Sequence, residues 1–170
     1  MAAGLFPVVA LALAFAGAVV PVHASEADAC AAFKWPLERE RQLFAAGPRQ
    51  VAAQGAFPVA AGAARVELKP VEGLAFVAGP ERKPAAGSFG AVLPLDAVPG
   101  AGLYQITLSA EAWLDVVQDG KLVRSGAFSG KEGCPSLRKS VRFTLTAAPT
   151  LIQISNAKAT SIDIAVLSAP

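Results

Sequence analysis

The stretch WLDVVQDGKLVRSGAFSG, residues 113–130, places Asp119 and Gly120 between two runs rich in apolar residues. Asp-Gly is one of the strongest signals for a two-residue hairpin turn, because both central residues of that turn adopt a positive φ. Side chains alternate between the two faces of a strand, so Trp113 and Asp115 fall on the same face of the strand before the turn. The stretch therefore predicts a β-hairpin that carries an aromatic ring beside a carboxylate.

Short alternating runs recur on both sides of this hairpin and predict further strands. The expected strands cover residues 64–69, 73–77, 88–95, 103–109, 113–118, 121–125, 138–145, 150–155 and 161–168. Turn residues separate them at the spacing typical of an all-β sandwich, and no stretch after residue 48 carries a long helical stripe. The sequence therefore predicts an all-β domain over residues 63–170, folded as an antiparallel, jelly-roll-like β-sandwich.

The same alternation predicts which side chains form the core. On three of the strands, one face is apolar and consists of Tyr104, Ile106, Leu108, Val141, Phe143, Leu145, Ile162, Ile164 and Val166. Intervening residues such as Gln105 and Thr107 are polar, and we expect them on the opposite face of the strand. Each fully buried branched or aromatic side chain contributes about 1.5–3 kcal/mol to the stability of such a domain.

Residues 25–62 are expected to form a short helical arm followed by a linker. Phe33, Leu37 and Phe44 share one helical stripe, and the charged run at residues 38–41 is expected to face solvent. A proline suits the first turn of the main helix, and a glycine–proline pair ends it. The sequence after this pair, up to the first expected strand, has no sustained period.

The first 24 residues are typical of a secretory signal peptide. They contain no charged side chain, have an apolar core from Leu5 to Val20, and end with Val22 and Ala24 before Ser25. An alternative interpretation is an uncleaved anchor, because about 20 apolar residues can span a bilayer. The signal peptide predicts a periplasmic or secreted protein with no stable membrane insertion after the leader is cleaved.

Two cysteines, Cys30 and Cys134, allow one intramolecular pairing. In an exported chain an even number of cysteines favours a disulfide, which would tie the helical arm to a loop of the sandwich. Closing a loop of about 100 residues contributes about 4–5 kcal/mol in the chain-entropy model, before the strain of the native bond is subtracted. The alternative is that Cys30 is a lipidated N-terminal residue, although residues 27–29 make a poor lipobox.

Charge and histidine content exclude several classes of function. The chain has 15 Lys and Arg against 13 Asp and Glu, a net charge of +2, which gives no electrostatic reason to expect nucleic acid as a partner. His23 is the only histidine and belongs to the predicted leader. The mature chain therefore lacks a histidine for a Ser-His-Asp or Cys-His pair, and for zinc, copper or iron sites built on imidazole.

Trp113 and Asp115 are the first candidate binding residues. An aromatic platform with a carboxylate beside it is a common way to hold a sugar ring or a peptide. The alternative is structural: Trp113 would cap the edge of the core, and Asp115 would accept hydrogen bonds from backbone amides of a neighbouring loop.

A basic group at residues 131–142 is the second candidate surface. Arg138 and Arg142 fall on the same strand face, with Lys139 and Lys131 nearby, so an anionic glycan or an acidic partner could dock there. The alternative is a solvated strand edge whose charges discourage aggregation.

Four carboxylates lie near one end of the expected sandwich: Glu111, Asp115, Asp119 and Glu132. A glycosidase-like hydrolase would need two of them about 5–10 Å apart in a cleft. Asp115 and Asp119, together with loop carbonyls, are also the candidates for a weak Ca²⁺ site, because such a site needs only oxygen ligands. No other cofactor or metal is expected.

The runs YQITLSAEAWLDVVQDG (104–120) and VRFTLTAAPTLIQISNAKATSIDIAVL (141–167) contain an aromatic-led strand, an aspartate in the next strand, a D-G turn and two closing strands. In this order of features, residues 100–168 resemble the bacterial pre-peptidase C-terminal domain and the wider galactose-binding-like group of jelly-roll modules. The chain also resembles small Ala-rich hypothetical exported proteins of proteobacteria. The first resemblance implies a secreted accessory module that binds proteins or glycans.

The sequence thus predicts an exported, non-catalytic binding or accessory module that recognises a glycan or an envelope protein. The expected ligand-binding residues are Trp113, Asp115, Arg138 and Arg142. The alternatives are a structural subunit of an envelope assembly and a carboxylate-based hydrolase.

Overall fold

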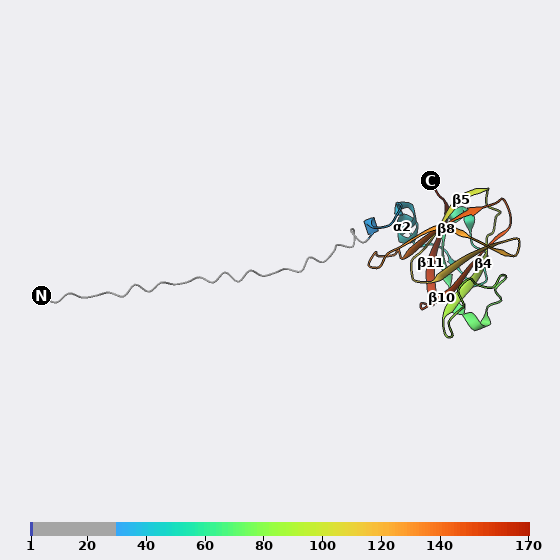
Figure 1. The fold of residues 1–170 in the computed structure, drawn as a ribbon, viewed down its shortest axis with the longest axis horizontal. Helices are drawn as coiled ribbons and strands as arrows, with labels where there is room; N and C mark the ends of the chain where they lie inside the picture. Colours follow the sequence, from blue (N-terminus) through green and yellow to red (C-terminus); the bar gives the residue numbers. More distant parts are fainter. Residues whose placement is uncertain (2–29) are drawn as a thin grey trace.

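The computed structural model describes residue 1 and residues 30–170 (Figure 1). The predicted signal peptide, residues 1–24, lies outside the described residues except for Met1. Within the described part of the chain, no helix is long and apolar enough to cross a membrane.

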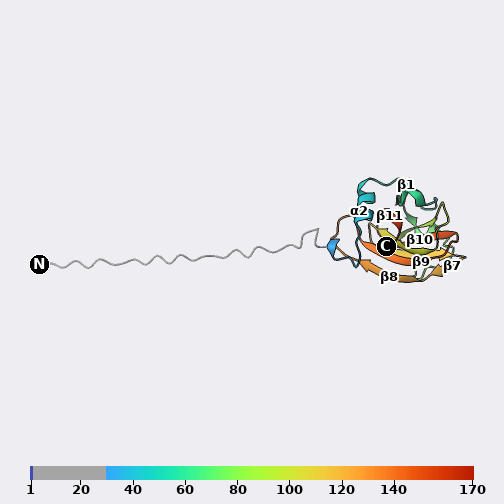
Figure 2. The ribbon, with the colours of Figure 1, turned by 90° about the horizontal axis from the view of Figure 1, so that it is seen from above.

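Two β-sheets pack face to face as a sandwich (Figures 1 and 2). The first sheet contains, in spatial order, β1 (Gln50–Val51), β2 (Ala63–Glu67), β11 (Ser161–Ser168), β5 (Gly102–Leu108), β9 (Lys139–Leu145) and β8 (Ser125–Gly130). The second contains β3 (Lys69–Pro70), β4 (Phe89–Pro94), β10 (Thr150–Ala157), β6 (Trp113–Gln118) and β7 (Lys121–Val123). All neighbouring strands are antiparallel except β1 and β2, which confirms the predicted β-sandwich.

Eight of these strands form four nested antiparallel pairs. The pairs are, from the outermost inward, β2 with β11, β4 with β10, β5 with β9, and β6 with β7. A long hairpin rolled up in this way, alternating between two sheets, is a jelly roll. Its innermost turn is Asp119-Gly120, where φ is 50° and 70°, as the predicted hairpin requires.

The main core lies between the two sheets. Eight of the nine expected core residues are buried, and Tyr104 is partly buried and packs against the same cluster. The second sheet contributes Leu114, Val116, Ile152 and Ile154 to this cluster. The alternation of the strands therefore identified the inner face of the first sheet, to which β5, β9 and β11 belong.

The outer face of the first sheet is covered by the N-terminal arm and by α2 (Glu38–Ala45) (Figure 1). Trp35 is buried there, and its Nε1 donates to Ser140 Oγ at 3.0 Å. Glu40, expected to face solvent, is only 2% exposed, because Gln105 Nε2 of β5 donates to its Oε1 at 2.6 Å. Polar residues on this face thus form a second, hydrogen-bonded interior.

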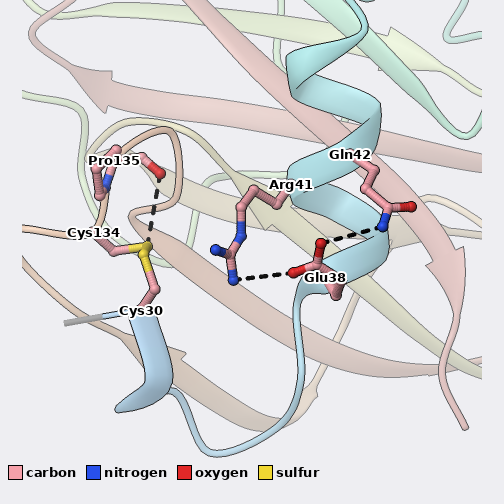
Figure 3. Close-up of polar contacts among 6 residues, drawn as sticks. All are labelled: Cys30, Glu38, Arg41, Gln42, Cys134 and Pro135. Carbon is pink, nitrogen blue, oxygen red and sulfur yellow. Dashed lines mark hydrogen bonds and ion pairs between the residues drawn. A yellow bond between two sulfur atoms is a disulfide. The ribbon is translucent and has the colours of Figure 1, made fainter. Parts of the chain in front are cut away.

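A disulfide joins Cys30 to Cys134, as predicted, and closes a sequence separation of 104 residues (Figure 3). Cys134 lies in the loop between β8 and β9, so the bond holds the start of the arm against the first sheet. On α2, Glu38 accepts from Arg41 at 3.2 Å and from Gln42 at 3.2 Å, and these exposed contacts stabilise the helix locally.

Three strand predictions are wrong. The run at 64–69 is interrupted at Leu68, so its first part belongs to β2 in the first sheet and Lys69 belongs to β3 in the second. Residues 73–77 are not a strand: Val77 and Ala78 donate their backbone amides to Gln153 Oε1, at 2.8 and 3.2 Å, and the segment crosses the outer face of the second sheet. The run at 121–125 is not one strand either. It ends at Val123, and after Arg124 the chain enters the other sheet as β8, which was not predicted.

Candidate functional site

A cavity of about 460 Å³ opens on the side of the sandwich where β7 and β8 form the sheet edges. It exists because β7 is short. β7 pairs only with Val116–Gln118 of β6, so within the described residues no strand pairs with the outer edge of residues 113–115. The floor of the cavity is apolar and is formed by Leu114, Val141 and Phe143.

Trp113 and Asp115 line this cavity together. Trp113 Nε1 donates to Asp115 Oδ1 at 3.0 Å, and the backbone amide of Glu81 donates to Asp115 Oδ2 at 3.3 Å. Burial raises the pKa of Asp115, while these two hydrogen bonds act in the opposite direction. The backbone contact is the one expected if Asp115 ties down a neighbouring loop, so this carboxylate has a structural task as well as a place at the cavity.

Two cations lie against the ring of Trp113. Lys139 Nζ is 4.8 Å and the guanidinium carbon of Arg82 is 5.6 Å from the ring centroid. Lys139 also donates to the carbonyl of Ala112 at 3.3 Å, and burial lowers the pKa of its ammonium group. Cation–π contacts and the bond to Asp115 thus hold the indole in place as a wall of the cavity.

Arg138 and Arg142 do not join Trp113 at the cavity. Arg138 binds Glu111 at 2.6 Å and Glu132 at 3.3 Å, and it is not among the residues that line the cavity. Arg142 lies on the face of β9 opposite to the cavity residues Val141 and Phe143, and its guanidinium carbon is 4.3 Å from the centroid of the Trp35 ring. The four predicted ligand-binding residues are therefore divided between three places.

Two members of the basic group, Lys139 and Arg142, do not lie on a sheet edge. β9, which contains Lys139 and Arg142, lies between β5 and β8 and has a partner on both sides. β8 is the edge strand, and it carries no charged residue. The edge-protection interpretation is therefore wrong for Lys139 and Arg142, whereas Lys131 directly follows the edge strand.

Only one of the four candidate carboxylates, Asp115, lines the cavity. Asp119 lies in the turn, four residues further along, which corresponds to about 13 Å of strand, so the two aspartates cannot share one Ca²⁺ ion. Residues 30–170 contain no group of three or more His, Cys, Asp or Glu side chains arranged to hold a metal. The second carboxylate at the cavity is Glu81, from a segment that the sequence did not connect with this site.

Two exposed apolar residues at the cavity were not predicted from the sequence. Phe128 of β8 is 61% exposed and Leu122 of β7 is 38% exposed. The available signal was that Phe128 is the single large apolar residue in SGAFSG, a segment with no core-forming alternation. Arg124 and Ser125, where the chain crosses between the sheets, complete this rim.

Comparison of the chain with models of protein families gave no match, and comparisons with curated proteins and with solved structures gave none either. The disulfide is typical of an oxidising, extracytoplasmic environment.

Proposed function

We propose that the protein is an exported, non-catalytic binding module and that the cavity between β6 and β8 is its ligand site. The observation that carries this proposal is the shape and lining of the cavity. Besides its apolar floor, which includes Phe143, it has the aromatic side chains of Trp113 and Phe128. A few polar groups also line it: Glu81, Asp115, Arg124 and Lys139 among them. Binding sites are commonly concave and mostly apolar, with a small number of polar groups that orient the ligand.

Export is supported by two independent features. The first 24 residues are typical of a signal peptide, and a disulfide such as Cys30–Cys134 is typical of an oxidising compartment. We therefore expect the protein in the periplasm or in the secreted fraction.

Of the two ligand classes, an envelope protein fits the cavity better than a glycan. A sugar platform needs a free aromatic face and free polar groups, whereas the ring of Trp113 contacts two cations and its N–H is bonded to Asp115. The exposed ring of Phe128 and the exposed side chain of Leu122 instead resemble the apolar anchors of a protein interface.

The test fills the cavity. Ser125 is exposed and lines the rim, so Ser125→Trp places a bulky side chain at the mouth, while Ser161→Trp, at an exposed serine where β11 begins, is the matched control. Immobilised wild type and both variants are incubated with native envelope extract and with a glycan array, after circular dichroism has verified folding.

We expect one envelope protein to be retained by wild type and by Ser161→Trp and lost with Ser125→Trp. A partner that all three proteins retain would mean an assembly subunit that does not use the cavity. If wild type binds a glycan and Ser125→Trp does not, the ligand of the cavity is a glycan rather than an envelope protein. Absence of any ligand that depends on the cavity would contradict the proposal.

A further inference from the structure

The edge strands of the two sheets differ in how well they are protected. β1 and β3 have two residues each, and β3 consists of a lysine and a proline. β7 has three residues and begins with Lys121. Short edges, lysines and prolines prevent the unpaired backbone groups of an edge from pairing with other chains. β8 has six residues, SGAFSG, with no charge and no proline, so apart from a register shift between Ser125 and Ala127 it lacks these protections.

The unprotected edge adjoins the cavity. Phe128 pairs with Val141 across β8 and β9, so both side chains lie on the same face, and Val141 forms part of the cavity floor. An extended chain added to β8 would continue the first sheet. Every second side chain of that added strand would face the mouth of the cavity.

Positive charges lie at both ends of this edge. Arg124 precedes β8 and Lys131 follows it, and Lys34 Nζ lies 5.3 Å from the centroid of the Phe128 ring. None of the ion pairs between described residues involves these three cations. Glu132, the nearest acid after β8, binds Arg138 instead. The edge is therefore complementary to an acidic segment.

The same charges argue against a second copy of this chain as the occupant. Antiparallel pairing of β8 with β8 of another copy would bring Arg124 of one copy close to Lys131 of the other. Like charges placed opposite each other on neighbouring strands are destabilising.

We propose that β8 binds an extended, acidic segment of a partner polypeptide by β-strand addition, with one apolar side chain of that segment in the cavity beside Phe128. This inference rests on the proposed function and names its ligand class. Main-chain hydrogen bonds supply the affinity, the cavity selects one apolar residue, and Arg124 and Lys131 select acidic neighbours.

The probe is a short capped peptide in which aspartate alternates with valine around a central phenylalanine. Two matched peptides accompany it: one has lysine in place of each aspartate, and the other has methylated backbone amides along one edge. Binding to the ¹⁵N-labelled chain is followed by amide chemical shifts. The variants are Arg124→Glu and, as control, Lys158→Glu in the exposed turn between β10 and β11.

We expect the acidic peptide to shift the amides of β8 and its neighbours and to leave those of β1 unchanged. Its Kd should be about tenfold lower than that of the lysine peptide, and Arg124→Glu should remove this preference while Lys158→Glu keeps it. Backbone methylation should abolish binding, because it removes the donors of the added strand.

Three results would overturn the inference. Equal binding of the acidic and lysine peptides would remove the charge selectivity, and undiminished binding of the methylated peptide would remove strand addition. Concentration-dependent shifts of β8 without peptide would make a second copy the occupant. In each case, an envelope partner lost with Ser125→Trp would still support the cavity as the binding site, so the two proposals fail separately.

Discussion

Trp35 and Trp113 make the same kinds of contact in two different regions of the molecule. The indole N–H of Trp35 donates to Ser140 Oγ at 3.0 Å, and its ring lies against the guanidinium of Arg142. The indole N–H of Trp113 donates to Asp115 Oδ1, also at 3.0 Å, and its ring lies against the ammonium of Lys139.

The two regions differ in what covers them. Trp35 belongs to an arm that is joined to the sandwich by the disulfide and shields the outer face of the first sheet. Trp113 is half-buried, because β7 ends at Val123 and, within residues 30–170, no strand pairs with the edge of β6 beside it. An aromatic ring with a cation is therefore a structural element where the chain buries it, as at Trp35. It is a candidate binding wall where, as at Trp113, the segment that carries Arg82 leaves it half-buried.

The largest effect is expected from removing the covered ring. Trp35→Ala should lower the free energy of unfolding by about 3–5 kcal/mol, because it leaves a cavity and removes the hydrogen bond to Ser140. Trp113→Ala should lower it by less than half of that amount, since part of its side chain already contacts solvent. Urea unfolding followed by circular dichroism measures both values. Equal losses would break the distinction between the two regions.

A smaller effect is expected from removing the disulfide that attaches the N-terminal arm to the sandwich. Replacing both Cys30 and Cys134 by serine should reduce stability by about 2–4 kcal/mol, because the unfolded chain regains the freedom of a long closed loop. Hydrogen exchange should then accelerate in the arm and around α2 while the amides of β6 stay protected. Acceleration that reaches β6 to the same degree would show that the arm and the cavity region unfold as one unit.

The smallest effect is a pH dependence at the open region. Because burial raises the pKa of Asp115 in the folded state, the folded chain binds more protons than the unfolded chain above about pH 4. The stability of wild type should therefore fall, relative to Asp115→Asn, as the pH rises through this range. Denaturant unfolding between pH 3 and 7 measures it, with Asp119→Asn in the exposed turn as control. If the stability of wild type relative to Asp115→Asn instead rises with pH, the effect of the hydrogen bonds on the pKa of Asp115 outweighs the effect of its burial.

Local rules predicted the elements that depend on neighbouring residues. The Asp119-Gly120 turn, the limits of β6 and the inner faces of β5, β9 and β11 followed from turn chemistry and from the two-residue period of strands. The same rules misassigned residues 73–77, where the amide of Val77 bonds to the side chain of Gln153 rather than to a strand. An alternating pattern cannot distinguish these two partners.

The candidate site was predicted only in part. Trp113 and Asp115 share a strand face, so their proximity followed from the period, but Glu81 and Phe128 reach the cavity from segments distant in sequence. Arg138 and Arg142 look equivalent on one strand. They differ in the structure because Arg138 forms ion pairs with two glutamates, while Arg142 lies over the ring of the arm residue Trp35.

By itself, the sequence determined that this chain forms a sandwich of antiparallel strands around an Asp-Gly hairpin, with its single pair of cysteines joined. Turn geometry, strand period and a cysteine count of two are local or composition-based constraints. Only the tertiary structure decided that the arm buries Glu40 and Gln105, and that the chain crosses at Arg124 and leaves β8 as an open edge beside a cavity. Those features depend on which segments cover which faces, and that choice is made by packing between residues far apart in the chain.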